Sequence, residues 1–147
     1  MVTTLLSDFY TRDLRKFIDE VNLFKQEDNL WRTDGTIKNS SGNLALHIIG
    51  GTNYLIGTQL ANTGYVRNRD QEFIIKGVPR KELVTQLEAL IPMIQLTLQA
   101  HSDAQLDEEY PLMFDGAKRS KSYIFIQLLA HLNYHLGQVN YLRRVLE

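Results

Sequence analysis

The sequence contains no cysteine, and this absence removes several kinds of chemistry at once. Without thiols, the chain forms no disulfide, binds no metal through thiolate sulfur and has no cysteine nucleophile. Any metal ion must be held by histidine, by carboxylate or through water. The composition is compatible with the cytoplasm but leaves the redox compartment open.

An excess of charge is also missing, since 16 basic and 17 acidic residues leave a formal net charge of -1. No overall field draws such a protein to nucleic acid or to an anionic membrane, so neither is expected as a partner. The N-terminal stretch MVTTLLSDFYTRDLRKF lacks a basic start and an uninterrupted apolar run, because Asp8 and Arg12 break it early. A secretory signal is not indicated, and we expect a cytoplasmic protein.

Two segments, residues 39–66 and 122–142, carry no formal charge, and by length either could be mistaken for a membrane span. Both contain amide side chains, namely Asn39, Asn43, Asn53, Gln59 and Asn62 in the first and Gln127, Asn133, Gln138 and Asn140 in the second. Each amide is costly in hydrocarbon unless it finds a partner. We expect both segments to be helices that are largely enclosed by protein.

Four segments show the three- and four-residue apolar spacing of amphipathic helices. They are expected at about residues 2–27 and 42–63, from Pro79 to about His101, and from about Ser120 nearly to the C-terminus. Ser40 or Ser41 is a plausible N-cap for the second helix and Ser120 for the fourth, while Pro79 is suited to the first position of the third. Pro92 falls inside the third helix and should kink or split it.

No alternating strand pattern, internal repeat or low-complexity tract is present, so the fold class is all-α. A single domain over residues 1–147, folded as a four-helix bundle, is the economical architecture. In the first helix the inward apolar residues are expected to be Leu5, Phe9, Phe17, Val21 and Phe24. The segment GYVRNRDQEFIIKG is expected to be a surface connection in which Arg67 and Arg69 pair with Asp70 and Glu72.

Three of the four histidines fall in the two charge-free segments. His131 and His135 are four residues apart on the inward stripe of the last helix, and this spacing lets two imidazoles reach one ion. His47 lies on the expected inward stripe of the second helix, which reads Leu44, His47, Gly51, Tyr54 or Leu55, and Thr58. Three neutral nitrogens suit a divalent ion such as zinc or nickel, with a further position left to water.

Other interpretations of these histidines have to be weighed. A pair spaced four apart on a helix also arises by chance, and buried histidines are often satisfied by ordinary hydrogen bonds. His101 ends the third helix and is expected to interact with the helix dipole rather than with metal. No glutamate precedes a histidine by three residues, which disfavours a di-iron carboxylate bundle, and Leu132 stands where a zincin needs glutamate.

His47 in NLALHIIGG, together with the C-terminal HLNYHLGQVNYLRRVL, resembles the DinB-like superfamily of four-helix-bundle proteins. Its hallmark is one histidine on the second helix and an H-x-x-x-H pair on the last, and the continuation through Gly137 and Gln138 strengthens the likeness. RNRDQEF also resembles a segment of an uncharacterised subgroup. The resemblance implies a crossover that makes the second and third helices parallel, and a divalent metal ion bound by His47, His131 and His135.

The family also implies candidate activities and a homodimer. Some relatives are metal-dependent thiol S-transferases that use bacillithiol or mycothiol, others isomerise maleylpyruvate with mycothiol, and many have no assigned activity. We expect a metal-dependent enzyme, a transferase or a hydrolase, that activates a low-molecular-weight thiol or water for attack on a small electrophilic substrate. Because the chain has no cysteine, the thiol would be a cosubstrate.

Tyr54, beyond His47 on the second helix, and Gln138, one turn beyond His135, are candidate helpers of the site, although packing or the orientation of a ligand is the favoured role for each. Two other functions stay open at this point. One is a non-catalytic metal-binding or stress-related protein, and the other is a structural dimeric bundle whose histidines bind nothing.

Overall fold

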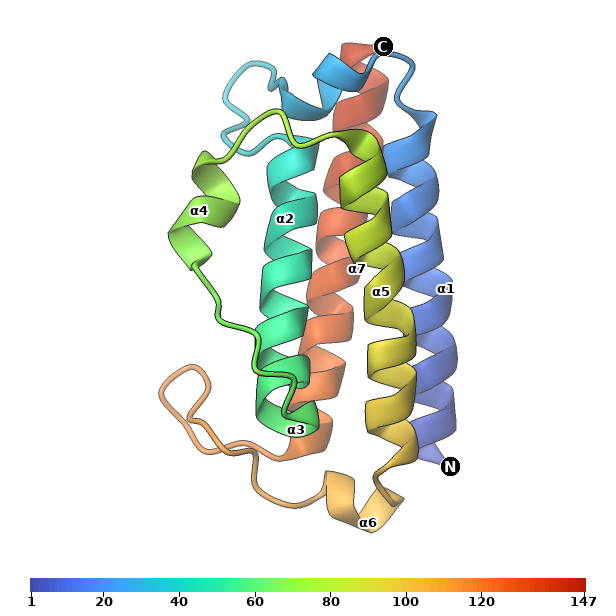
Figure 1. Cartoon of the computed structure of the whole chain (residues 1–147), viewed down its shortest axis with the longest axis vertical. Coiled ribbons are helices and arrows are strands. Elements are labelled where there is room, and N and C mark those ends of the chain that lie inside the picture. The colour runs from blue at the N-terminus through green and yellow to red at the C-terminus, as the bar shows by residue number, and fades with distance from the viewer.

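Four long helices form an all-α bundle in the computed structural model, which describes residues 1–147 (Figure 1). The long helices are α1 (Val2–Leu23), α2 (Ser41–Thr52), α5 (Arg80–Gln99) and α7 (Lys121–Leu146). Five short elements join or extend them: the 3-10 helix η1 (Glu27–Trp31), the π-helix η2 (Asn53–Thr58), and α3 (Gln59–Ala61), α4 (Arg69–Ile74) and α6 (Asp103–Leu106). The predicted four-helix bundle is confirmed.

The connectivity includes a crossover on the outside of the bundle. Arg80, at the start of α5, donates to the carbonyl oxygen of Phe24 just after α1, whereas Asp103, beyond the end of α5, accepts from the backbone N–H of Val2. α1 and α5 are therefore antiparallel, and Figure 1 shows α2 running in the same direction as α5 and α7 in the same direction as α1. The segment that contains α4 passes along the bundle to join α3 to α5, so the crossover is confirmed as well.

Serine side chains fix the first turns of the two helices on which the site is built. Ser40 Oγ accepts from the backbone N–H of Asn43 at 3.2 Å, and Ser120 Oγ accepts from that of Tyr123 at 3.1 Å. A side-chain oxygen in this position satisfies an N–H that has no partner within the helix.

Pro79 lies just before α5 rather than inside it, and α5 continues through Pro92 as one helix.

The core is one cluster of 25 buried residues, most of them from the four long helices. In α1 the buried face contains Leu6 and Tyr10, whereas the predicted Leu5 and Phe9 are 57% and 42% exposed. The prediction for Leu5 and Phe9 was wrong by one residue, because each of them is followed directly by another large side chain, Leu6 or Tyr10. The Tyr10 hydroxyl decides the register, since it donates to the carbonyl oxygen of Phe125 in α7 at 2.6 Å.

The second helix departs from the expected stripe at η2. Tyr54, Leu55 and Thr58 are only half-buried, while Ile56 has no exposed surface. A π-helix closes i→i+5 hydrogen bonds and puts more residues into a turn, so the face that points inward shifts along the sequence. The stripe predicted from α-helical spacing holds as far as Gly51 and fails beyond it.

None of the helices is both long enough and apolar enough to cross a membrane. The two charge-free segments are instead helices of the bundle.

Candidate metal centre

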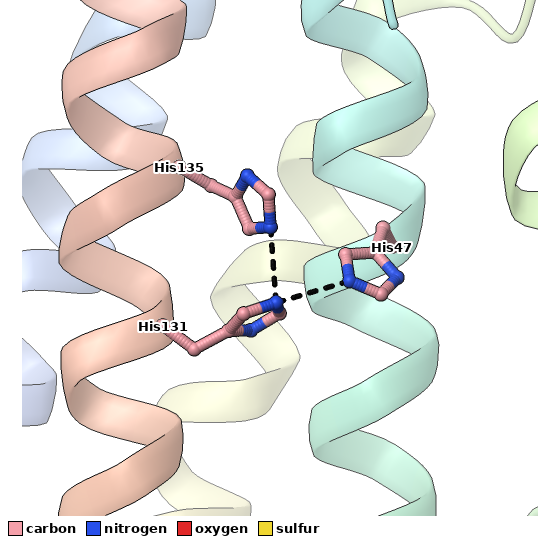
Figure 2. A group of neighbouring side chains, drawn as sticks. All are labelled: His47, His131 and His135. Atoms are coloured by element: carbon pink, nitrogen blue, oxygen red, sulfur yellow. Dashed lines mark hydrogen bonds between the residues drawn. The ribbon is translucent and has the colours of Figure 1, made fainter.

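The three predicted histidines converge on one point between α2 and α7. His47 Nε2 lies 3.1 Å from His131 Nε2, which in turn lies 2.9 Å from His135 Nε2. One ring nitrogen from each histidine lies within 4.8 Å of the other two. Figure 2 shows the rings of His131 and His135 extending from α7 toward His47 on α2. Residues far apart in the sequence are thus brought together as one cluster.

Outer hydrogen bonds hold two of the rings so that their Nε2 atoms face the cluster. His47 Nδ1 lies 3.0 Å from Glu72 Oε1, and His135 Nδ1 lies 2.7 Å from Gln138 Oε1. Since a carboxylate and an amide oxygen only accept, both Nδ1 atoms must carry the proton. The Nε2 atoms of His47 and His135 are then acceptors, and each directs a lone pair at His131.

The cluster has more acceptors than protons, because a single proton cannot satisfy two facing lone pairs. His131 can place its own Nε2–H toward one neighbour, but it then has no proton for the other. Zinc–nitrogen bonds of about 2.0–2.1 Å put two ring nitrogens about 2.9–3.4 Å apart for bond angles near 90–110°. The distances from His131 to its two neighbours agree with that range. These two distances therefore fit a first-row divalent ion.

Burial keeps the imidazoles neutral and able to donate lone pairs. Loss of solvent, with the neighbouring histidines and arginines adding to it, lowers the pKa of His131 to about 4. Burial also lowers the pKa of His47, although the hydrogen bond and the charge of Glu72 act in the opposite direction. Burial lowers the pKa of His135 as well, and the hydrogen bond with Gln138 opposes this shift. At neutral pH a metal ion has no protons to displace from Nε2 of His47 and His135.

Glu72 is a member of this site that the sequence reasoning placed on a surface connection. It lies in α4, only 6% exposed, and its carboxylate bonds both His47 and Arg67. The expected pairing of Arg67 with Glu72 is present, but at a buried position beside a candidate ligand. A signal was available in Gly50 and Gly51, because two consecutive glycines inside a helix cost about 1 kcal/mol each and need a packing reason.

A cavity of about 590 Å³ opens beside the histidine cluster. Its wall contains His135 and Gln138 and is otherwise mostly apolar: Ile37, Leu44, Tyr134, Tyr141, Leu142 and Val145, with Lys38 and Asn39 at the loop before α2. The volume falls within the range of small-molecule sites, which are apolar pockets with a few polar groups. Of the three histidines, only His135 contributes to the wall of this cavity.

Tyr54 and His101 lie away from this cavity. Tyr54 lines a second cavity of about 560 Å³ with Arg67 and Arg69, and it makes no hydrogen bond to a histidine. Its role as a helper stays a prediction, whereas Gln138 contacts His135 directly. His101 Nδ1 lies 2.8 Å from the carbonyl oxygen of Thr97, so this histidine binds the end of its own helix as expected.

Comparison with known proteins shows which fold carries the cluster. A crystal structure of a DinB-like protein from Bacillus cereus ATCC 10987, at 2.01 Å resolution, superposes with a TM-score of 0.72 and 16% sequence identity. The match covers 95% of this chain and 89% of that one. No protein-family model and no curated protein matches the sequence. The protein is therefore an all-α bundle with the DinB-like fold, and the resemblance seen in the sequence is confirmed at the level of fold.

Proposed function

We propose that the protein is a divalent-metal-dependent enzyme that acts on a small molecule bound in the cavity beside His135. The observation that carries the proposal is the convergence of three Nε2 atoms, two of which have their protons held on the far side of the ring. A cluster of acceptors with at most one donor among them is costly unless it binds a cation. Zinc and nickel are the ions that this donor set suits best.

The cavity supports catalysis rather than metal storage. A closed structural site surrounds its ion with protein ligands, whereas a catalytic site leaves a position for water or substrate. Here the chain supplies three histidines, and the apolar cavity reaches one of them. A divalent ion held there would act as a Lewis acid that lowers the pKa of a thiol or water brought to it.

The residues around the cavity suggest what kind of substrate it receives. Tyr134 and Tyr141 present large aromatic surfaces, and Lys38 is the one charged side chain of the wall. This lining favours an apolar electrophile that is neutral or carries a negative charge near Lys38. Because the chain has no cysteine, a transferase reaction draws its sulfur nucleophile from a free low-molecular-weight thiol, and a hydrolase reaction uses water.

The test begins with the metal content of protein purified without a histidine tag. Wild type should contain close to one divalent ion per chain, and His131→Ala should contain almost none. His101→Ala is the matched control, because it removes the histidine outside the cluster and should leave the metal content unchanged. Equal, near-zero metal in wild type and His131→Ala would overturn the proposal and leave a structural bundle.

Turnover is measured next, on wild type loaded with zinc or nickel. A panel of apolar electrophiles is offered with and without a small thiol, and product formation should depend on both the metal and His131. Metal binding without turnover across the panel would instead identify a non-catalytic metal-binding protein. The homodimer remains a separate prediction, which light scattering of the purified protein checks.

A further inference from the structure

The crossover segment brings a buried carboxylate against the outer nitrogen of His47. Glu72 Oε1 lies 3.0 Å from His47 Nδ1, on the side of the ring away from the cluster. The end of α4 is fastened to the start of α2 by Asn43, whose amide donates to the carbonyl oxygens of Glu72 and Ile75 at 2.9 and 2.8 Å. Asn43 is fully buried, so these bonds fix where the carboxylate can lie.

Arg67 holds the carboxylate from its other side. The guanidinium donates from Nε to Glu72 Oε2 and from Nη2 to Oε1, both at 2.9 Å. A guanidinium bound through two parallel hydrogen bonds fixes the plane of a carboxylate as well as its position, and it offsets the charge that burial would otherwise penalise. Glu72 therefore presents one defined oxygen to His47.

Two glycines of α2 make room for this pair. A Cβ atom built on Gly50 would lie 1.9 Å from Glu72 Oε2, and one on Gly51 would lie 3.3 Å from Arg67 Nη2. The carboxylate thus sits directly on the bare backbone of α2, in a space that no other residue would leave. This contact accounts for two consecutive glycines in a helix that they otherwise weaken.

We propose that Glu72, held by Arg67 in the gap at Gly50, is a positioning residue that sets the tautomer and the ring orientation of His47. By accepting the Nδ1 proton, it keeps Nε2 free and directed at the other two histidines. The inference rests on the proposed metal site and adds to it a dependence on the crossover segment. Loss of such an outer partner usually lowers metal affinity about 10- to 100-fold.

The most informative variant is Gly50→Ala, because it removes no hydrogen-bonding side chain from the protein. Alanine favours the helix, yet its methyl group must displace the carboxylate, so metal affinity should fall about 10- to 100-fold. Gly137→Ala is the matched control, since this helical glycine near His135 has no atom within 4 Å of a built Cβ. Its metal affinity should equal that of wild type, measured by competition with a chromophoric chelator.

Glu72→Ala and Glu72→Gln separate positioning from a merely structural role. Nitrogen-15 spectra of the histidine rings in metal-free, folded protein should show the Nδ1–H tautomer for His47 in wild type. Glu72→Ala should shift it toward Nε2–H, and Glu72→Gln, whose amide oxygen can still accept, should restore part of the wild-type tautomer and affinity. Circular dichroism selects the folded variants, and Glu72→Gln keeps the side-chain volume if Glu72→Ala does not fold.

The inference is overturned if the Glu72 variants and Gly50→Ala bind metal within twofold of wild type and keep the His47 tautomer. That result would leave the proposed metal site standing, because wild type would still bind metal and His131→Ala would not. Absence of metal binding in wild type would be a different failure, that of the proposed function. The tautomer of His47 would then still decide whether Glu72 orients the ring.

Discussion

In the metal-free protein, replacing His131 with leucine should make the fold less stable. The imidazole of His131 stands between two Nε2 acceptors at 3.1 and 2.9 Å and has at most one proton to offer them. Its Nε2–H can therefore satisfy only one of them, and the other lone pair has no donor. Leucine has a comparable size but no donor, so the substitution retains most of the packing and leaves both acceptors unsatisfied.

The size of the effect follows from the cost of one unsatisfied polar group. A buried acceptor without a donor costs about 1–3 kcal/mol, and His131 is only half-buried, so we take the lower part of that range. A loss of about 1–2 kcal/mol corresponds to a fall in Tm of roughly 3–6 °C for a domain of this length. Added zinc should widen the difference, because it stabilises wild type and has little to bind in the variant.

Urea denaturation at neutral pH, first with a chelator and then with zinc, measures both halves of the prediction. His101→Leu is the control, since its Nδ1 is already bonded to the carbonyl oxygen of Thr97. That variant should lose about 0.5–1.5 kcal/mol, as expected when an ordinary hydrogen bond is removed. A His131→Leu protein that is as stable as wild type in chelator, or more stable, would refute the argument from the unsatisfied acceptors.

Three further predictions concern stability. Ser120→Ala removes the oxygen that accepts from the N–H of Tyr123 and should lower the free energy of unfolding by about 1 kcal/mol in urea titrations; an unchanged midpoint would contradict the cap. Tyr10→Phe loses the buried bond to the carbonyl of Phe125 and should cost about 1–2 kcal/mol by thermal denaturation, with the helical spectrum retained. The folded-state pKa of His131 lies below its ordinary value of 6.5, at about 4, so the unfolded chain binds protons first. The contribution of His131 to the stability of the metal-free protein is thus fully present above about pH 6.5 and is lost as the pH falls toward 4, so the pH slope should be smaller in His131→Leu.

Helix α7 and its two histidines could be predicted because the information is local. A serine at position 120 begins the helix, apolar residues recur every three or four positions, and His131 and His135 share that face by spacing alone. His47 could be added because it lies in the part of the second helix where ordinary α-helical geometry holds. These features need no knowledge of distant contacts.

The remaining parts depend on contacts that no local pattern records. The choice between Leu5 and Leu6 as the buried residue of α1 follows from a bond made by Tyr10 to a different helix. The π-helical turn after Thr52 moves Ile56 inward, although α-helical spacing favours its neighbours. The burial of Glu72 arises only when the crossover is laid against α2, and a polar segment looks like a solvated connection until then.

The candidate ligands differ in how far apart they lie in the sequence, and this difference predicts the order in which they can bind a metal ion during folding. His131 and His135 bracket a single helical turn, so a metal ion can bind them as soon as that turn forms. His47 is 84 positions away from His131 and joins only when α2 docks on α7. Refolding rates measured with and without metal would thus show whether α7 is already ordered at the barrier. Acceleration of folding would place its turn in the transition state, whereas slower unfolding alone would place metal capture after the barrier.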